Sequence, residues 1–151
     1  MFSFFKKKNF FTAEEQQLII EAIQNAERMT SGEVRVFVES KCSYMDAIDR
    51  AAELFFQLEM QKTDDRNAVL LYVAMKDRQL AVFGDEGIHK RVGNEYWNNA
   101  VQKMISNFNR ENYATGIAEV VKDIGAALTK NFPFNNDTDK NELPDEIVFG
   151  K

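Results

Sequence analysis

Two short acidic loops, one before and one after a pair of apolar extended segments, hold the residues best suited to bind a ligand or to catalyse a reaction. Asp64 and Asp65 precede the apolar segment 68–75, and Asp85 and Glu86 follow the next extended segment. Carboxylates gathered on neighbouring loops repel one another unless protons or a cation neutralise them, and oxygen ligands without thiolates favour calcium or magnesium over zinc. These four residues therefore predict a site for a divalent cation, calcium or magnesium, provided that the fold brings the two loops together.

The same residues also have a simpler interpretation. Asp and Glu are common in loops because they cap helices and initiate turns, and Asp85 or Glu86 could cap a turn that begins at Gly87. A helix N-terminus at that point would oppose a cation, since that end of the helix dipole is positive. The ligand spacing of an EF-hand is absent from the sequence. Both interpretations remain open at the level of sequence.

Nucleophilic catalysis and nucleotide binding have less support. His89 is the only histidine and Cys42 the only cysteine, and the strand order inferred below puts them at opposite ends of the sheet. We expect Cys42 to be an inert packed thiol and His89 to be a surface helix residue. The loop 84–87 lacks the lysine and hydroxyl residue of a Walker loop. A phosphatase would have to use the four carboxylates to hold a metal that activates water, with only Lys90 and Arg91 available for phosphate.

Hydrophobic periodicity predicts the elements that position these residues. The first helix begins at Thr12, with a capping pattern of Thr12 and Glu15, and ends near Gly32, and a strand follows over 33–39. A second helix has cap signals at Ser43 and Asp46 and ends at about residue 60. After it come a central strand over 68–75, a strand over 78–83, a helical turn over 88–92 and two further helices. The tight turn before 78–83 predicts a hairpin, and the helix before the central strand predicts a parallel crossover. The hairpin places Asp64 and Asp65 opposite Asp85 and Glu86. The predicted fold is α/β: an α/β/α sandwich with a small mixed β-sheet flanked by about five helices.

Length and charge bound the remaining possibilities. The 151 residues predict one α/β domain over 12–132, with an N-terminal extension over 1–11 and an extended acidic tail over 133–151. A net charge of −5 disfavours nucleic acid, and no apolar run reaches the ~18–20 residues of a membrane span. The start fails as a signal peptide, and a single cysteine forms no internal disulfide. We expect a cytoplasmic protein that binds a divalent cation and a protein partner. Its Phe-rich, Lys-bearing start could also touch a membrane surface.

Several short motifs, taken together and in order, resemble the TPM domain family, which is found in bacterial envelope proteins and in a thylakoid photosystem-repair protein. The resemblance covers roughly residues 11–133. The motifs are Ser31-Gly32-Glu33-Val34-Arg35-Val36, Asn67-Ala68-Val69-Leu70-Leu71-Tyr72-Val73-Ala74 with Lys76-Asp77-Arg78, Gly84-Asp85 and Gly87-Ile88, and Asn112-Tyr113-Ala114 with Gly116-Ile117 leading to Asn131-Phe132-Pro133.

The resemblance implies an α/β sandwich and a calcium or other divalent-metal site in an acidic groove at the end of the hairpin. Family members have been proposed as acid phosphatases. Carried over to this chain, the ligands are Asp64 and Asp65 from the first loop and Asp85 and Glu86 from the second. The hairpin of family members typically ends in Gly-Tyr-Gly-Leu-Glu, whereas this chain has Gly-Asp-Glu-Gly-Ile. Without the signal peptide and anchor of the envelope members, the chain resembles a short, cytosolic, stand-alone branch.

Three hypotheses follow. The first is a non-catalytic calcium-binding module that uses the four carboxylates, with no firmly assignable catalytic activity. The second is a metal-dependent acid phosphatase that hydrolyses a phosphomonoester at the same carboxylates. The third is an adaptor that docks a protein partner through residues 2–11 or the acidic tail.

Overall fold

The computed structural model describes residues 10–42, 44–109, 112–134 and 147–150. The elements are α1 (Ala13–Arg28), β1 (Glu33–Glu39), α2 (Ala47–Gln57), β2 (Ala68–Ala74), β3 (Gln79–Gly84), α3 (Glu86–Asn109), α4 (Tyr113–Asn131) and β4 (Val148–Phe149). The predicted α/β class is confirmed. A break in α3 at Gly93, where φ is 79° and ψ is 172°, divides that helix into two pieces. Counting the pieces separately accounts for the expectation of about five helices.

The four strands form one mixed sheet in the order β3-β2-β1-β4. β1 and β2 are parallel, with Val36 opposite Leu71, and β2 and β3 are antiparallel, with Leu71 opposite Val82. Both the parallel crossover and the hairpin predicted from the sequence are therefore confirmed. The start of β2 and the end of β3 consequently lie at one end of the sheet, together with the start of β1.

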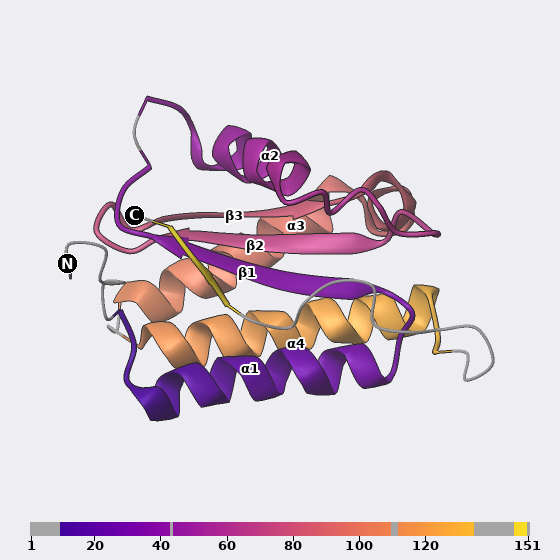
Figure 1. Ribbon diagram of the computed structural model, residues 1–151, viewed down its shortest axis with the longest axis horizontal. Helices are drawn as coiled ribbons and strands as arrows, with labels where there is room; N and C mark the ends of the chain where they lie inside the picture. The colour runs from indigo at the N-terminus through magenta and orange to yellow at the C-terminus, as the bar shows by residue number, and fades with distance from the viewer. Residues whose placement is uncertain (1–9, 43, 110–111, 135–146, 151) are drawn as a thin grey trace.

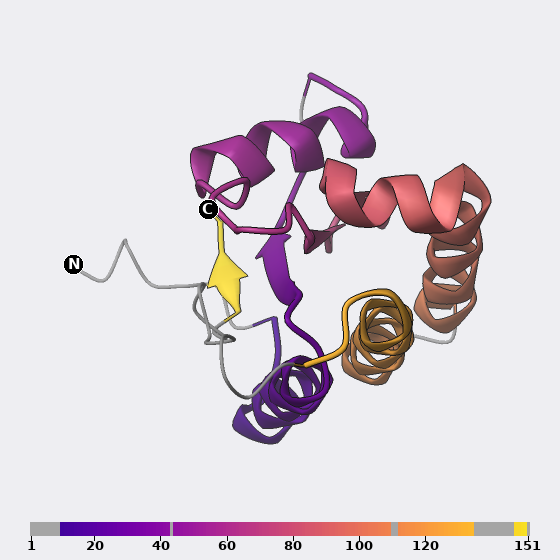
Figure 2. The same cartoon turned by 90° about the vertical axis from the view of Figure 1, so that its right-hand side faces the viewer.

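Helices cover both faces of this sheet (Figure 1). α2 lies on one face, while α1, α4 and the second piece of α3 lie toward the other, as the end-on view also shows (Figure 2). Val34 and Val69 belong to the core under α1 and α4, and Phe37 and Tyr72 to the core under α2. Every residue of β2 is buried, because both faces of this central strand are covered.

The helix starts follow the local signals only in part. Thr12 and Glu15 form the predicted capping box, since the Thr12 N–H donates to Glu15 and the Glu15 N–H donates to the Thr12 hydroxyl. Asp46 is the N-cap of α2 but its side chain accepts no capping hydrogen bond, and Ser43 lies outside the described residues. None of the helices in the described part of the chain has the length and apolar character that a membrane span requires.

The end of the chain adds the strand that periodicity did not reveal. β4 pairs in parallel with β1, placing Phe37 opposite Val148. Phe10 stacks on Phe149 with 6.3 Å between ring centroids, and Phe11 lies 6.5 Å from the same ring. Val148 and Phe149, near the end of the predicted tail, thus dock on the domain and complete one edge of the sheet. The rest of the tail, residues 135–146, and residues 1–9 of the extension lie outside the described residues.

Candidate functional site

Two loops meet at the end of the sheet where β2 starts and β3 ends, and we call residues 64–67 and 85–87 the acidic end. The Asp85 N–H donates to the Ala68 carbonyl at 2.9 Å, and the Gly87 N–H donates to the Arg66 carbonyl at 2.8 Å. A Cβ atom on Gly87 would lie 2.1 Å from the Asp65 carbonyl oxygen. Only glycine permits this close approach, so the first residues of α3 are fastened directly to the loop before β2.

Asp85 is the buried centre of the acidic end, with 3% of its surface exposed. Arg66 donates to both of its carboxylate oxygens, from Nε at 2.6 Å and from a terminal nitrogen at 2.8 Å. The other terminal nitrogen of Arg66 lies 3.3 Å from Glu86. These hydrogen bonds raise the pKa of the Arg66 guanidinium, and the bond to Asp85 is the main cause. A fixed positive charge therefore sits between two of the four predicted ligands.

The other two predicted ligands are on the surface of the same end. Asp64 and Asp65 are exposed, and neither side chain forms a hydrogen bond or ion pair within the described part of the chain. Across the described residues, no group of three or more His, Cys, Asp or Glu side chains is arranged to hold a metal ion. The structure thus joins Asp85 and Glu86 through Arg66, and it leaves Asp64 and Asp65 on the adjacent loop.

Asn67 is a further oxygen donor at this end that the sequence did not single out as a ligand. It is buried, its side-chain nitrogen donates to the Ser31 hydroxyl at 3.2 Å, and its N–H donates to the Thr63 hydroxyl at 3.3 Å. Its side-chain oxygen has no hydrogen-bond partner among the described residues. An amide oxygen is a common ligand of hard cations. An unpaired buried oxygen is the only signal for it, and such a signal exists only in the folded chain.

His89 lies on α3, two residues after the acidic end. Its Nδ1 accepts a hydrogen bond from the Trp97 indole at 2.9 Å, so the neutral ring carries its proton on Nε2. With Nδ1 occupied and Nε2 protonated, the ring offers no free lone pair to a metal. Arg91 donates to the Asn131 carbonyl at 2.9 Å and lies over the Phe132 ring. This residue, suggested as a phosphate contact, is therefore directed toward the end of α4.

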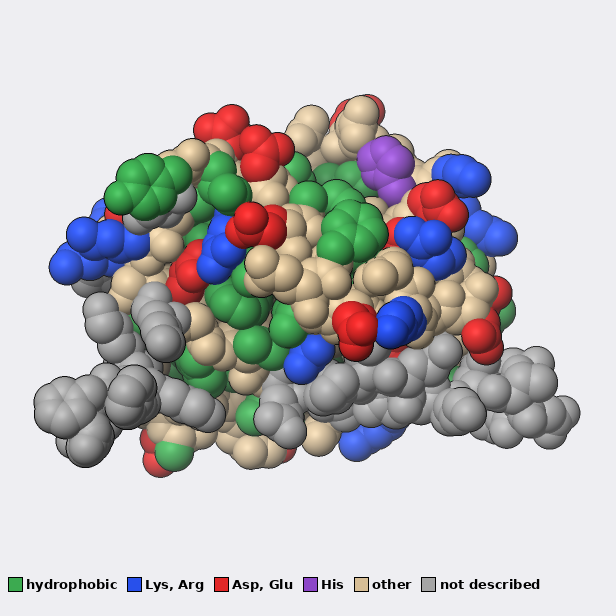
Figure 3. Space-filling view, turned by 45° about the horizontal axis from the view of Figure 1, so that its top comes forward, with side chains coloured by type: hydrophobic (Ala, Val, Ile, Leu, Met, Phe, Trp, Pro, Cys, Tyr) green, Lys and Arg blue, Asp and Glu red, His purple; other side chains and the backbone are tan. Residues whose placement is uncertain are grey.

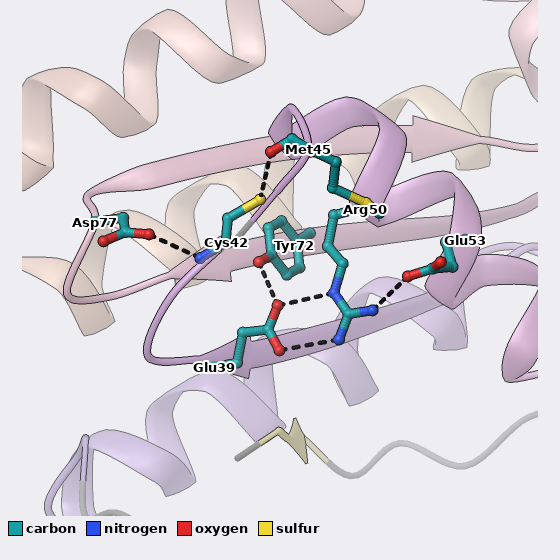
Figure 4. A network of polar contacts seen from close by, with 7 residues as sticks. All are labelled: Glu39, Cys42, Met45, Arg50, Glu53, Tyr72 and Asp77. Atoms are coloured by element: carbon teal, nitrogen blue, oxygen red, sulfur yellow. Dashed lines mark hydrogen bonds and ion pairs between the residues drawn. The ribbon is translucent and has the colours of Figure 1, made fainter.

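The opposite end of the sheet also holds a buried carboxylate, that of Glu39, which sequence reasoning missed. Figure 4 shows Glu39 between Arg50 of α2 and the hydroxyl of Tyr72, which donates to it. Arg50 contacts both Glu39 oxygens, at 2.9 and 3.1 Å. Burial, with help from the Glu39 hydrogen bond, raises the pKa of Tyr72 above its usual value near 10. This cluster fastens α2 to β1 and β2.

Cys42 lies at this opposite end, as the strand order predicted. It is buried, its N–H donates to Asp77 at 2.8 Å and its thiol donates to the Met45 carbonyl at 3.2 Å. A thiol packed in this way is a structural residue. His89 lies next to the acidic end, so the structure does not bring the single cysteine and the single histidine together.

Comparisons with known proteins place this arrangement in a family. The sequence profile of the TPM domain matches residues 5–127. The NMR structure of the BA42 protein from the psychrophilic bacterium Bizionia argentinensis is 39% identical, spans 96% of this chain and 99% of its own, and superposes with a TM-score of 0.87. The search of curated proteins returned no match.

Two more distant structures share the fold alone. The N-terminal domain of the cg2496 protein from Corynebacterium glutamicum is 12% identical, with a TM-score of 0.65 over 80% of this chain and 76% of its own. An N-terminal domain from P. gingivalis is 16% identical, with a TM-score of 0.68 over 82% of this chain and 80% of its own. The profile match over most of the chain shows that it belongs to the TPM domain family.

Proposed function

We propose that the acidic end binds a divalent cation, calcium or magnesium, through Asp64, Asp65, Asp85 and Glu86. The observation that supports this most strongly is the imbalance of charge on two loops joined by backbone hydrogen bonds. Arg66 is the single guanidinium that contacts the pair Asp85 and Glu86, while Asp64 and Asp65 have no cationic partner within the described residues. A bound divalent cation would add two positive charges to the one of Arg66, and so would neutralise the four carboxylates more fully. The TPM resemblance leads to the same expectation.

The donor set fits a hard cation in its chemistry. It consists of carboxylate oxygens with the unpaired Asn67 side-chain oxygen close by in sequence, and no thiolate is present at this end. Arg66 occupies both oxygens of Asp85. The cation and the guanidinium therefore compete for the same carboxylate, and we infer that Arg66 moves away from Asp85 when the cation binds.

A calcium titration of the metal-free full chain, followed through backbone amide NMR shifts, tests the proposal. We expect shifts concentrated at residues 64–67 and 85–87. The double substitution Asp64→Asn and Asp65→Asn should weaken binding without disturbing the fold, because both side chains are exposed. Asp77→Asn, in the turn at the other end of the hairpin, is the matched control and should leave the titration unchanged. Shifts spread equally over both ends, or unaltered in the double variant, would rule out the site.

Arg66→Gln tests the competition itself. Removing the guanidinium should tighten calcium binding, because the cation no longer displaces a fixed positive charge from Asp85. The readout is the calcium dissociation constant by calorimetry, compared with that of Arg50→Gln at the opposite end. Weaker binding in Arg66→Gln would show instead that Arg66 organises the loop for the cation.

The phosphatase hypothesis uses the same carboxylates and stays a prediction. Arg66 is bonded to Asp85 and Glu86, and Arg91 contacts Asn131 and Phe132, so neither guanidinium is poised for a phosphate. We therefore advance cation binding without a catalytic step. An assay of phosphomonoester hydrolysis in the calcium-loaded sample separates the two hypotheses, because turnover that is lost in the Asp64→Asn and Asp65→Asn variant would establish catalysis at this site.

A further inference from the structure

The outer edge of β3 has no strand paired with it among the described residues, and it lies at the bottom of a groove, where Leu80 and Val82 are 8% and 3% exposed. β3 is the terminal strand of the sheet, and the Asp85 N–H bonds back to Ala68 of β2. Backbone groups alternate in direction along an antiparallel strand, so the N–H and C=O groups of Leu80 and Val82 point away from β2. No strand or loop of the described residues pairs with them. Such an edge is a template for one more extended segment.

An apolar groove follows this edge between α2 and α3. Its volume is about 860 Å³, and its lining includes Ile48 and Phe56 of α2, Phe83 of β3 and Val101 of α3. Ile48 and Phe56 are each 49% exposed, which is a large exposed fraction for apolar side chains on the face of α2 that borders the groove. Figure 3 shows a face on which hydrophobic side chains are exposed among acidic and basic ones. Large apolar side chains beside an open strand edge fit the alternate side chains of an added strand.

The charges at the two ends of the groove specify the occupant further. Asp46 lies at one end, and Asp85 and Glu86 lie at the other. The single arginine of the lining, Arg66, is already bonded to Asp85 and Glu86. An extended segment that is apolar along its length and basic at an end complements this pattern.

The chain itself contains such a segment. Its start reads Phe2-Ser3-Phe4-Phe5-Lys6-Lys7-Lys8, with Phe2 and Phe4 at alternate positions and three consecutive lysines after them. In an extended conformation Phe2 and Phe4 point to the same side, so both rings can pack against the apolar side chains of Ile48 and Phe56 that line the groove.

The strand order of the sheet favours a second copy of the chain as the source of the segment that enters the groove. Phe10 and Phe11 contact Phe149 in β4, and β4 and β3 are the two opposite edges of the sheet. Three strand spacings of about 4.8 Å separate them, and the path must also pass around the flanking helices. Reaching the groove of the same chain would use up much of the segment as a linker. We propose that residues 2–8 of one copy dock as an added strand on β3 of another copy.

Paramagnetic relaxation between two full-length chains tests this contact. One sample carries a nitroxide on Ser3→Cys in the Cys42→Ser background, in which serine can still donate to the Met45 carbonyl. It is mixed with an isotopically labelled wild-type chain that has no nitroxide. We expect loss of signal intensity at amides 80–84 and at the α2 residues that line the groove, rising with concentration and reversed by reduction of the nitroxide.

Matched variants of the labelled chain decide whether the groove is responsible. Ile48→Ser with Phe56→Ser should abolish the intensity loss at β3, and Leu18→Ser, a similarly exposed residue on α1, should leave it intact. Unchanged amide shifts in β4 verify the fold of each variant. An absence of intensity loss at β3, loss centred on another surface, or binding of the labelled start to anionic vesicles with β3 unaffected would overturn the proposal.

Discussion

Both ends of the sheet contain a buried carboxylate held by an arginine, yet the two pairs differ in what surrounds them. Glu39 is bound by Arg50, which extends from the helix α2 with 25% of its side chain exposed, and also by the Tyr72 hydroxyl. Asp85 is bound by Arg66, which extends from a loop with 37% of its side chain exposed. Arg66 also has a positive φ of 51°, a conformation that costs energy outside glycine.

The neighbouring charges sharpen the difference. Arg50 contacts Glu39 and Glu53 at the opposite end, where the buried carboxylate is fully satisfied by an arginine and a tyrosine. The acidic end adds Glu86, Asp64 and Asp65 around one arginine on a loop. The Arg50–Glu39 ion pair is therefore structural, because it holds α2 against the sheet. At the acidic end the similar pair has a more exposed arginine and excess negative charge around it, and under the proposed function this pair gives way to a cation.

Parallel substitutions of the two arginines are expected to give the largest contrast. Arg50→Gln should lower the free energy of unfolding by about 2 kcal/mol, because Glu39 keeps only Tyr72 in a buried position. Arg66→Gln should cost less, since Asp85 still accepts the Glu86 N–H at 2.8 Å and lies next to solvent-exposed loops. Urea denaturation of both variants in chelator measures the two losses.

Adding calcium gives a second comparison of Arg66→Gln with Arg50→Gln. A ligand that binds only the folded state stabilises it by mass action, so calcium should raise the melting temperature of Arg66→Gln more than that of Arg50→Gln. Equal losses in chelator, together with equal gains in calcium, would mean that the two ends do not differ as argued.

Gly87→Ala tests the rigid connection at the acidic end. The added methyl group would meet the backbone carbonyl oxygens of Asp65 and Arg66 at 2.1 and 2.6 Å, and overpacking against backbone costs about 2 kcal/mol. Lys90→Ala, at an exposed position of the same helix, is the control and should change the free energy of unfolding by less than about 0.5 kcal/mol. Thermal unfolding compares them. A loss in Gly87→Ala no larger than that in Lys90→Ala would show that the two loops separate easily.

Tyr72→Phe is expected to have the smallest effect at neutral pH, about 1 kcal/mol for one hydrogen bond to Glu39. Its effect on alkaline stability is more specific. The folded-state pKa of Tyr72 is raised above the ordinary value of 10, so the folded chain retains a proton that the unfolded chain loses. This contribution to stability is complete below pH 10 and declines as the pH rises above that value.

The alkaline loss of stability should therefore be shallower in Tyr72→Phe than in the wild type. Tyr44→Phe, at an exposed tyrosine, should follow the wild-type profile. Urea midpoints measured on both sides of pH 10 give the comparison. Identical slopes in the wild type and Tyr72→Phe would mean that the Glu39 cluster does not hold the phenol proton.

Much of the fold could be predicted because it depends on local patterns. The alternation of Val34, Val36 and Val38 predicted β1, and the uninterrupted apolar run that follows the acidic loop predicted the buried central strand. The capping pattern of Thr12 and Glu15 predicted the start of α1. The tight turn predicted the hairpin, and the hairpin placed both acidic loops at one end of the sheet.

The polar partners within the sites could not be predicted in this way. Arg66 stands in the acidic loop, but its pairing with Asp85 crosses 19 residues. Glu39 meets Arg50 and Tyr72 from three separate elements, and β4 is too short to show any periodicity.

The sequence by itself determined the helices, the first three strands, the hairpin and the gathering of carboxylates at one end of the sheet, because repeated apolar spacing reports burial over many residues at once. The tertiary structure alone decided that Arg66 pairs with Asp85, that the Asn67 side-chain oxygen stays unpaired among the described residues, and that no described strand pairs with the outer edge of β3. Each of these depends on where a single polar group finds a partner, and that is settled only when distant segments pack together.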